Sequence, residues 1–198
     1  ETNTSGIITA AADIIAGAFN ALPKRVCNQH KFSDYADYLH ENLPAQAELD
    51  LQREKPLNPA PLVSVAIACS GASRAAVRST LEALGKQTYA NFEVCVVSEL
   101  AQAGLTDYEG IPKFRLVLFN GTAHEQLKAA EKMLNGAYFL QLLPGDLPAP
   151  DALHMLVLQT HANPEAEVVF ADEDSVIDGI RQNPIFKPDY GRDTLRSF

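Results

Sequence analysis

Three consecutive carboxylates, Asp172, Glu173 and Asp174, are the densest group of chemically active side chains in this 198-residue chain. They follow an apolar run that we interpret as a buried strand at 167–171. Carboxylates at the end of a buried strand are costly unless they face a cation, hydrogen-bond donors or solvent. The triplet is therefore a candidate ligand site. The alternative is that Asp174 caps the turn before Val176 while its two neighbours are only solvated.

Two further polar positions follow from a strand–helix–strand pattern in residues 61–100. Residues 62–69 and 92–98 are apolar and β-branched, and helical spacing of apolar residues predicts a helix over 73–84, capped by Ser73. Such a crossover places the ends of both strands side by side at the carboxyl edge of a parallel sheet, where open α/β folds bind ligands. Ser70 and Glu99 are the residues expected at that edge.

The same alternation continues along the chain. Apolar runs predict strands at 114–119, 138–143 and 167–171, and helical spacing predicts helices at 124–134 and from Pro150. Strands that alternate with helices indicate an α/β fold, with a mostly parallel sheet and helices on both faces.

The first sixty residues have a different character. Residues 6–22 and 32–43 have helical patterns, and the first is too short and too polar for a membrane span or a signal peptide. Residues 52–61 contain three prolines and predict an extended tether. We therefore expect a helical N-terminal segment at 1–60 and an α/β domain at 61–198.

Composition limits the functional classes. A formal net charge of −9 argues against binding nucleic acid or anionic lipid through a basic face. Cys27, Cys69 and Cys95 have no metal-ligand spacing, and the last two fall in apolar strands, so we expect buried free thiols and a cytoplasmic protein. His124, His154 and His161 lie on predicted helices or at their ends and have no shared ligand face, which argues against a histidine metal site.

Five sequence blocks occur in a characteristic order: 62–65, 87–94, 150–153, 170–174 and 186–190. They resemble inverting family 2 glycosyltransferases with the GT-A fold, a Rossmann-like nucleotide-sugar-binding fold. The last two blocks are typical of enzymes that build bacterial surface polysaccharides such as O-antigen. The resemblance covers residues 35–198 and implies a nucleoside-diphosphate sugar as donor, with a glycan or a lipid-linked acceptor.

The resemblance also implies a divalent cation, Mn²⁺ or Mg²⁺, that neutralises the diphosphate. Family members hold it with an Asp-x-Asp-Asp turn after the fourth strand, and an ungapped alignment places residues 143–146 there. Leu143 and Gly145 replace two of the carboxylates, so Asp146 is the remaining candidate metal ligand. The alternative is that Asp146 only forms the turn.

Three more donor-site candidates come from the same resemblance. Glu99 replaces the carboxylate pair that holds uridine and ribose, Ser70 stands where an aromatic–Asn pair is usual, and Lys128 lies where family members approach the donor phosphates. The alternative for Lys128 is a solvated position on a helix face. The 172–174 triplet falls on the sugar or acceptor side.

Three functional hypotheses remain open. The first is the donor side of an active inverting hexosyl- or deoxyhexosyltransferase in bacterial polysaccharide biosynthesis, with the general base beyond Phe198 and the chain itself inactive. The second is a degenerate GT-A domain that braces a second transferase domain, or binds glycan, peripheral to the inner membrane. The third is a plain nucleotide-binding domain, for which no Gly-x-Gly-x-x-Gly or Walker-type loop is present.

Overall fold

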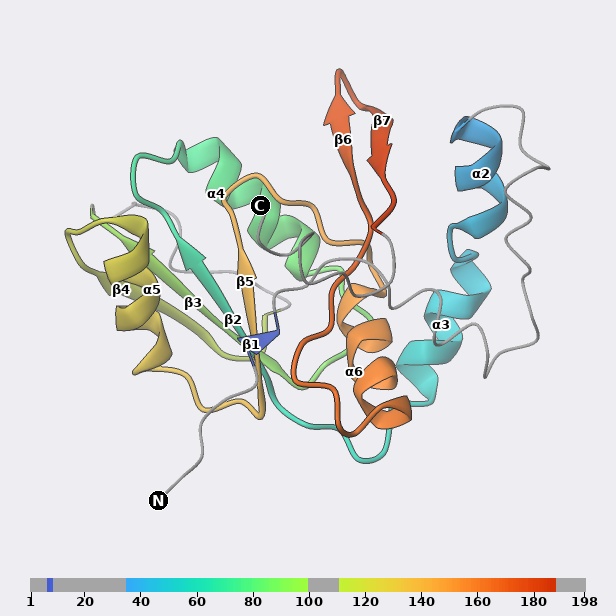
Figure 1. Ribbon diagram of the computed structural model, residues 1–198, viewed down its shortest axis with the longest axis horizontal. Helices are drawn as coiled ribbons and strands as arrows, with labels where there is room; N and C mark the ends of the chain where they lie inside the picture. Colours follow the sequence, from blue (N-terminus) through green and yellow to red (C-terminus); the bar gives the residue numbers. More distant parts are fainter. Residues whose placement is uncertain (1–6, 9–34, 100–110, 188–198) are drawn as a thin grey trace.

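A parallel sheet forms the centre of the computed structural model, which describes residues 7–8, 35–99 and 111–187 (Figure 1). Its strand order is β1-β5-β2-β3-β4, and every neighbouring pair is parallel. The strands are β1 (Ile7–Ile8), β2 (Val63–Ala68), β3 (Phe92–Ser98), β4 (Phe114–Leu118) and β5 (Tyr138–Leu142). The predicted α/β fold and the strands near 62–69, 92–98, 114–119 and 138–143 are confirmed.

Helices cover both faces of the sheet. On one face, α4 (Arg74–Leu84) and α6 (Ala152–Ala162) pack against the strand residues typified by Val65 and Ile67. On the other face, α5 (Ala123–Glu131) packs against Ala66 and Cys95. Successive strand residues point to opposite faces, so β2 and β3 are buried along their whole length.

The helix starts follow local capping chemistry. The Ser73 side chain accepts a hydrogen bond from the backbone N–H of Ala76 at 3.2 Å, as predicted for the cap of α4. Thr122 and Glu125 form a reciprocal capping box at the start of α5. These caps fix where each crossover leaves the carboxyl edge of the sheet.

The predicted fifth strand at 167–171 is wrong. In that range only Ala171 forms an isolated bridge, and the next residues form an antiparallel hairpin of β6 (Glu173–Ile177) and β7 (Ile180–Ile185). Asp178 and Gly179 form its two-residue turn with φ of 53° and 78°, the backbone that Asp-Gly favours in hairpins. Pairing across so short a turn has a small closure entropy, and the free edge of β5 is occupied by β1 instead.

The N-terminal part contains two described helices, α2 (Tyr35–Asn42) and α3 (Gln46–Glu54). The first confirms the core of the helix expected at 32–43. The second overlaps the tether expected at 52–61, which is therefore shorter than predicted. Residues 7 and 8 form strand β1 rather than the start of a helix, and the rest of the helix expected at 6–22 lies outside the described residues.

Cys69 and Cys95 are free and buried, as predicted. Burial raises the pKa of each thiol to about 11. Cys27 lies outside the described residues. Within the described ranges, no helix combines the length and the apolar character needed to cross a bilayer.

Candidate functional site

Ser70 and Glu99 meet at the carboxyl edge of the sheet. Ser70 follows β2 and Glu99 follows β3, and the Ser70 hydroxyl donates to Glu99 Oε1 at 3.3 Å. Both side chains are exposed, so the carboxylate can accept a further hydrogen bond from a ligand. The structure thus brings together two of the four predicted donor-site residues.

The turn after β5 lies at the same edge, because β5 is parallel to β2 on its other side. Asp146 Oδ2 accepts the backbone N–H of Leu143 at 2.7 Å, which closes the turn on itself. The Thr80 hydroxyl of α4 accepts the N–H of Gly145 at 2.8 Å. Gly145 has φ +105°, so the backbone of this turn requires glycine. Thr80 therefore fixes the turn against the helix that follows β2.

The 143–146 turn does not supply enough oxygen ligands to bind a divalent cation. The two positions at which the resemblance predicts carboxylates are Leu143, 58% exposed, and Gly145, while one Asp146 oxygen is already a turn acceptor. In the part of the chain that the structure describes, no group of three His, Cys, Asp or Glu residues could hold a metal ion. A hard cation needs several oxygen ligands, so these residues do not fit a dedicated metal site.

Lys128 is not brought to the other candidates. It is exposed in the last turn of α5, which covers the opposite face of the sheet from α4. Because α5 runs from the carboxyl edge back toward the amino edge, its last turn is its end farther from Ser70 and Glu99.

The carboxylates of 172–174 do not end a buried strand, since they begin the β6–β7 hairpin. Asp174 Oδ2 accepts the Tyr35 hydroxyl at 2.5 Å and the Arg181 Nε–H at 2.6 Å. Asp172 Oδ1 accepts the backbone N–H of Lys187 at 2.7 Å, and Glu173 lies 3.5 Å from Lys187 Nζ. These contacts connect the hairpin to α2 and to Lys187, and the place of the triplet on the sugar or acceptor side stays a prediction.

Several residues of the family-like blocks hold the scaffold together. The Gln87 amide donates to the Ala149 carbonyl at 2.6 Å and accepts the Leu153 N–H at 2.9 Å, which caps α6. The Thr88 hydroxyl donates to Gln52 of α3 at 2.6 Å. Burial raises the pKa of the neighbouring Tyr89 to about 12, and its hydroxyl donates to the Pro61 carbonyl. The block at 87–89 thus positions α6 and α3.

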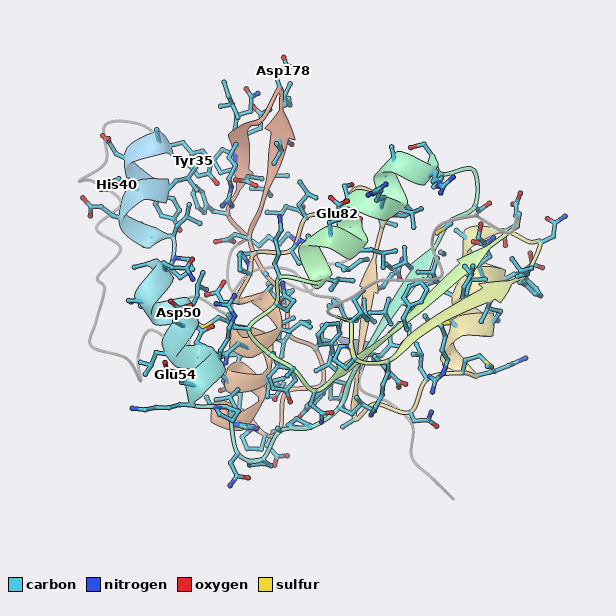
Figure 2. All side chains as sticks on the ribbon, turned by 180° about the vertical axis from the view of Figure 1, so that it is seen from behind. Tyr35, His40, Asp50, Glu54, Glu82 and Asp178 are labelled. Carbon is cyan, nitrogen blue, oxygen red and sulfur yellow. The ribbon has the colours of Figure 1, made fainter. Side chains whose placement is uncertain are left out.

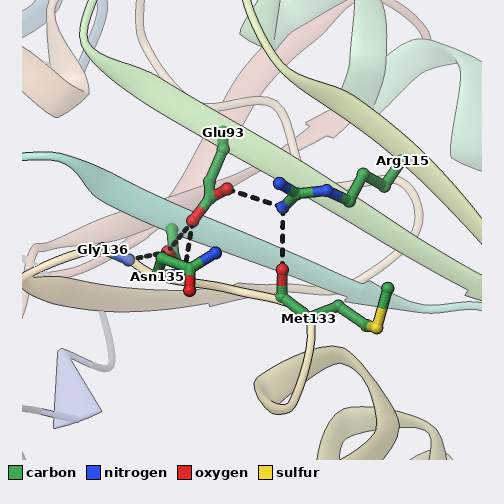
Figure 3. A network of polar contacts seen from close by, with 6 residues as sticks. Glu93, Arg115, Met133, Asn135 and Gly136 are labelled. Atoms are coloured by element: carbon green, nitrogen blue, oxygen red, sulfur yellow. Dashed lines mark hydrogen bonds and ion pairs between the residues drawn. The ribbon is translucent and has the colours of Figure 1, made fainter.

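Sequence reasoning missed a buried carboxylate at the amino end of the sheet. Glu93 is 1% exposed and accepts from the Ser64 hydroxyl at 2.7 Å, the Asn135 N–H at 2.6 Å and an Arg115 Nη at 2.7 Å (Figure 3). Burial by itself raises the pKa of Glu93, but these three donors outweigh it and hold the pKa below its usual value. The available signal was a lone Glu inside an otherwise apolar strand.

Comparison with known proteins gives two relatives, and no family model matches the chain. An uncharacterized protein, y4gI, of Sinorhizobium fredii (strain NBRC 101917 / NGR234) is 33% identical over 144 residues, which are 68% of this chain and 16% of that protein. The O-antigen biosynthesis protein RfbC of Myxococcus xanthus is 26% identical over 174 residues, 83% of this chain and 14% of that protein. The chain therefore spans about a sixth of the length of these relatives, or less.

Proposed function

We propose that this chain is the donor-side part of a glycosyltransferase of family 2 type that acts in bacterial polysaccharide biosynthesis. The observation that carries the proposal is the Ser70–Glu99 pair at the carboxyl edge of two adjacent parallel strands, beside the β5 turn. The similarity to a protein named for O-antigen biosynthesis supports the polysaccharide context.

In this proposal, Glu99 accepts a hydrogen bond from a ribose hydroxyl or a base N–H of the nucleoside, and Ser70 orients the carboxylate. The negative charge of the diphosphate is poorly compensated. Lys128 lies toward the far end of α5, and the 143–146 turn offers a single carboxylate to hold a cation. We expect weak nucleotide binding, in which a divalent cation is held chiefly by the diphosphate itself.

Inverting transfer also needs a carboxylate that accepts the proton of the acceptor hydroxyl. The contacts of the carboxylates at 172–174 with Tyr35, Arg181 and Lys187 support a structural role for them rather than that of the base. We therefore propose that the general base, and the site that holds the reacting hydroxyl of a glycan or lipid-linked acceptor, belong to another part of the enzyme. The 198-residue chain alone is expected to transfer no sugar.

The replacement of two carboxylates favours a second candidate, a GT-A-like domain without catalytic activity. Leu143 and Gly145 remove the ligands that would hold a cation, whereas the scaffold residues Gln87, Thr88 and Tyr89 keep their structural contacts. A domain that retains its packing contacts but lacks the metal ligands of the donor site could serve to brace a catalytic domain. In this proposal it does so on the cytoplasmic side of the membrane.

Calorimetric titration with uridine and thymidine diphosphates, with and without Mn²⁺, tests the donor site. We expect weak binding that is lost in Glu99→Ala and changes only a few fold in Asp146→Asn, which keeps the turn acceptor but removes the charge. Glu82→Gln on the exposed side of α4 is the control, because among the described residues its carboxylate pairs only with Arg78.

Other outcomes separate the candidates. Tight binding that needs Mn²⁺ and disappears in Asp146→Asn would show that the altered turn is a working metal site and would favour an active donor site. Absence of any nucleotide binding to the folded chain would reject the donor-site proposal and leave the bracing domain.

A further inference from the structure

A small cavity lies between α2 and the β6–β7 hairpin. Its volume is about 90 Å³, and none of its lining residues belongs to the carboxyl edge of the sheet. Figure 2 shows Tyr35 on the side of α2 that faces the hairpin, and Asp178 at the hairpin tip. The cavity is therefore separate from the Ser70–Glu99 edge and is formed by segments that are far apart in the sequence.

Aromatic rings form one wall of this cavity. Tyr35 and Tyr38 are stacked, with ring centroids 5.8 Å apart and an interplanar angle of 16°. Phe186 meets both rings edge-on, with centroids 6.4 Å from Tyr35 and 5.2 Å from Tyr38. Phe186 remains 50% exposed, so much of its surface is available for contact with a ligand. Exposed aromatic surface of this kind packs well against the C–H groups of a sugar ring.

Polar side chains line the rest of the cavity. The Nε–H of Arg181 donates to Asp174. Within the described part of the chain, the other four N–H donors of Arg181 make no hydrogen bond. The Glu173 side chain is 54% exposed, and its 3.5 Å separation from Lys187 Nζ is long for a hydrogen bond. Asn42 completes the polar lining. Fixed donors and acceptors beside an aromatic wall match the hydroxyl groups of a saccharide.

Charge and size narrow the ligand class further. Three carboxylates, Asp172, Glu173 and Asp174, lie near two cations, Arg181 and Lys187, so the surroundings do not attract an anion such as a diphosphate. The volume is well below the roughly 300–1,000 Å³ of pockets that bury a drug-sized ligand. The cavity suits part of one uncharged ring rather than a whole nucleotide sugar.

We propose that the cavity between α2 and the hairpin binds one neutral sugar unit of a glycan, with the apolar face of the sugar on Phe186 and its hydroxyls on Arg181 and Glu173. The choice of a glycan rests on the proposed polysaccharide function, whereas the site itself is separate from the nucleotide site at Ser70 and Glu99. A chain with both sites would hold a growing polysaccharide on the same domain that binds the donor.

NMR titration of the 198-residue chain with glucose, galactose, mannose, rhamnose and N-acetylglucosamine tests this proposal, and oligosaccharides of any sugar that binds extend it. We expect weak, saturable binding of at least one of these sugars, with the largest shifts in the rings of Tyr35, Tyr38 and Phe186 and in the side chain of Arg181. Phe186→Leu keeps an apolar side chain but removes the aromatic face, so affinity is expected to fall about tenfold. Glu173→Gln is expected to weaken binding by a smaller factor.

Phe119→Ala is the matched control, because Phe119 is an exposed aromatic residue, 39% accessible, that does not line the cavity. The affinity of the Phe119→Ala variant for sugar is expected to equal that of the original chain. Unchanged binding in Phe186→Leu, or no response of the cavity resonances to any of the five sugars, would overturn the proposal. Loss of nucleotide binding in Glu99→Ala with sugar binding retained would show that the two sites are independent.

Discussion

Glu93 shows at the level of one residue how this chain compensates a buried charge. A carboxylate that is 1% exposed is stable there only because the Ser64 hydroxyl, the Asn135 N–H and Arg115 donate to it. Ser64 and Glu93 are register partners on neighbouring strands, so the network joins β2 and β3. Arg115 brings in β4 and also donates to the Met133 carbonyl at 2.7 Å.

Glu93→Gln is expected to destabilise the fold by about 3 kcal/mol. The amide has one acceptor oxygen in place of two, and its NH₂ group would face donors, which leaves Arg115 without its charged partner. Urea denaturation followed by circular dichroism measures the change. The exposed Glu82→Gln variant, which loses only a surface pair with Arg78, is expected to change stability by less than about 0.5 kcal/mol.

The pH dependence of this variant gives an independent check. Hydrogen bonds hold the pKa of Glu93 in the folded state below its usual value of 4.5, so the carboxylate stabilises the fold above that pH. This stabilisation is lost as pH falls through the folded-state pKa. The stability of Glu93→Gln is therefore expected to fall less steeply below about pH 4.5 than that of the original chain. Equal acid slopes for the two proteins would contradict the assigned network.

Cys69 and Cys95 give a second prediction for individual residues. Both thiols are buried, and burial raises their pKa to about 11, so little thiolate exists at neutral pH. We expect both to stay unmodified by a thiol reagent in the native chain during the time that fully modifies the urea-unfolded chain. Mass spectrometric mapping assigns the labels. Rapid native labelling of either residue would show that its strand is not covered on both faces.

At the level of elements, glycines decide how closely segments approach. A Cβ at Gly136 would lie 2.5 Å from Ser64 Oγ and 2.7 Å from both the Leu62 carbonyl oxygen and the Ser64 nitrogen. Two of these neighbours are backbone atoms of the β2 region, which cannot yield. The Gly136 N–H also donates to Ser64 Oγ at 2.7 Å, so the approach of β5 to β2 depends on this residue.

Gly136→Ala is expected to lower the free energy of unfolding by about 2 kcal/mol or more, because it forces β5 away from β2. Gly179→Ala at the hairpin turn is the comparison. Its Cβ would meet no atom within 4 Å, but φ is +78°, so only backbone strain of about 1 kcal/mol is expected. Thermal unfolding of both variants measures the difference, and a larger loss for Gly179→Ala would contradict the close approach at Gly136.

For the whole molecule, the N-terminal helices connect two late segments of the chain. Gln52 of α3 contacts the block at 87–89, and it also donates a hydrogen bond to Asp151 at the start of α6. Burial nevertheless raises the pKa of Asp151. α2 contacts the hairpin through Tyr35 and Asp174, which are 139 residues apart. These contacts, together with the packing of Tyr38 against Phe186, position the hairpin against α2.

Tyr35→Phe tests this connection, because it removes the hydroxyl that donates to Asp174 and keeps the stacked ring. We expect a local loss of about 1 kcal/mol. Hydrogen exchange is expected to become faster in α2 and in β6, with β2 and β3 unchanged. Equal acceleration across the central sheet would show instead that α2 is part of the main cooperative unit.

The sequence by itself predicted the elements whose patterns are local. The buried runs of β2 and β3, the Ser73 cap and the spacing of Val77, Leu81 and Leu84 in α4 follow from periodicities of two and 3.6 and from capping chemistry. The adjacency of Ser70 and Glu99 also followed, because a right-handed crossover leaves little choice of edge.

Only the tertiary structure decided which distant groups meet. The segment at 167–171 has strand-like composition but does not join the sheet. The residues that follow this segment pair with β7 across the Asp178-Gly179 turn, and β1 occupies the free edge of β5. The partners of Glu93 and Asp174 come from other elements, and no local pattern specifies them. Composition and spacing determine what each segment can form, whereas burial and hydrogen bonding across the packed chain determine which of its polar groups remain free for a ligand.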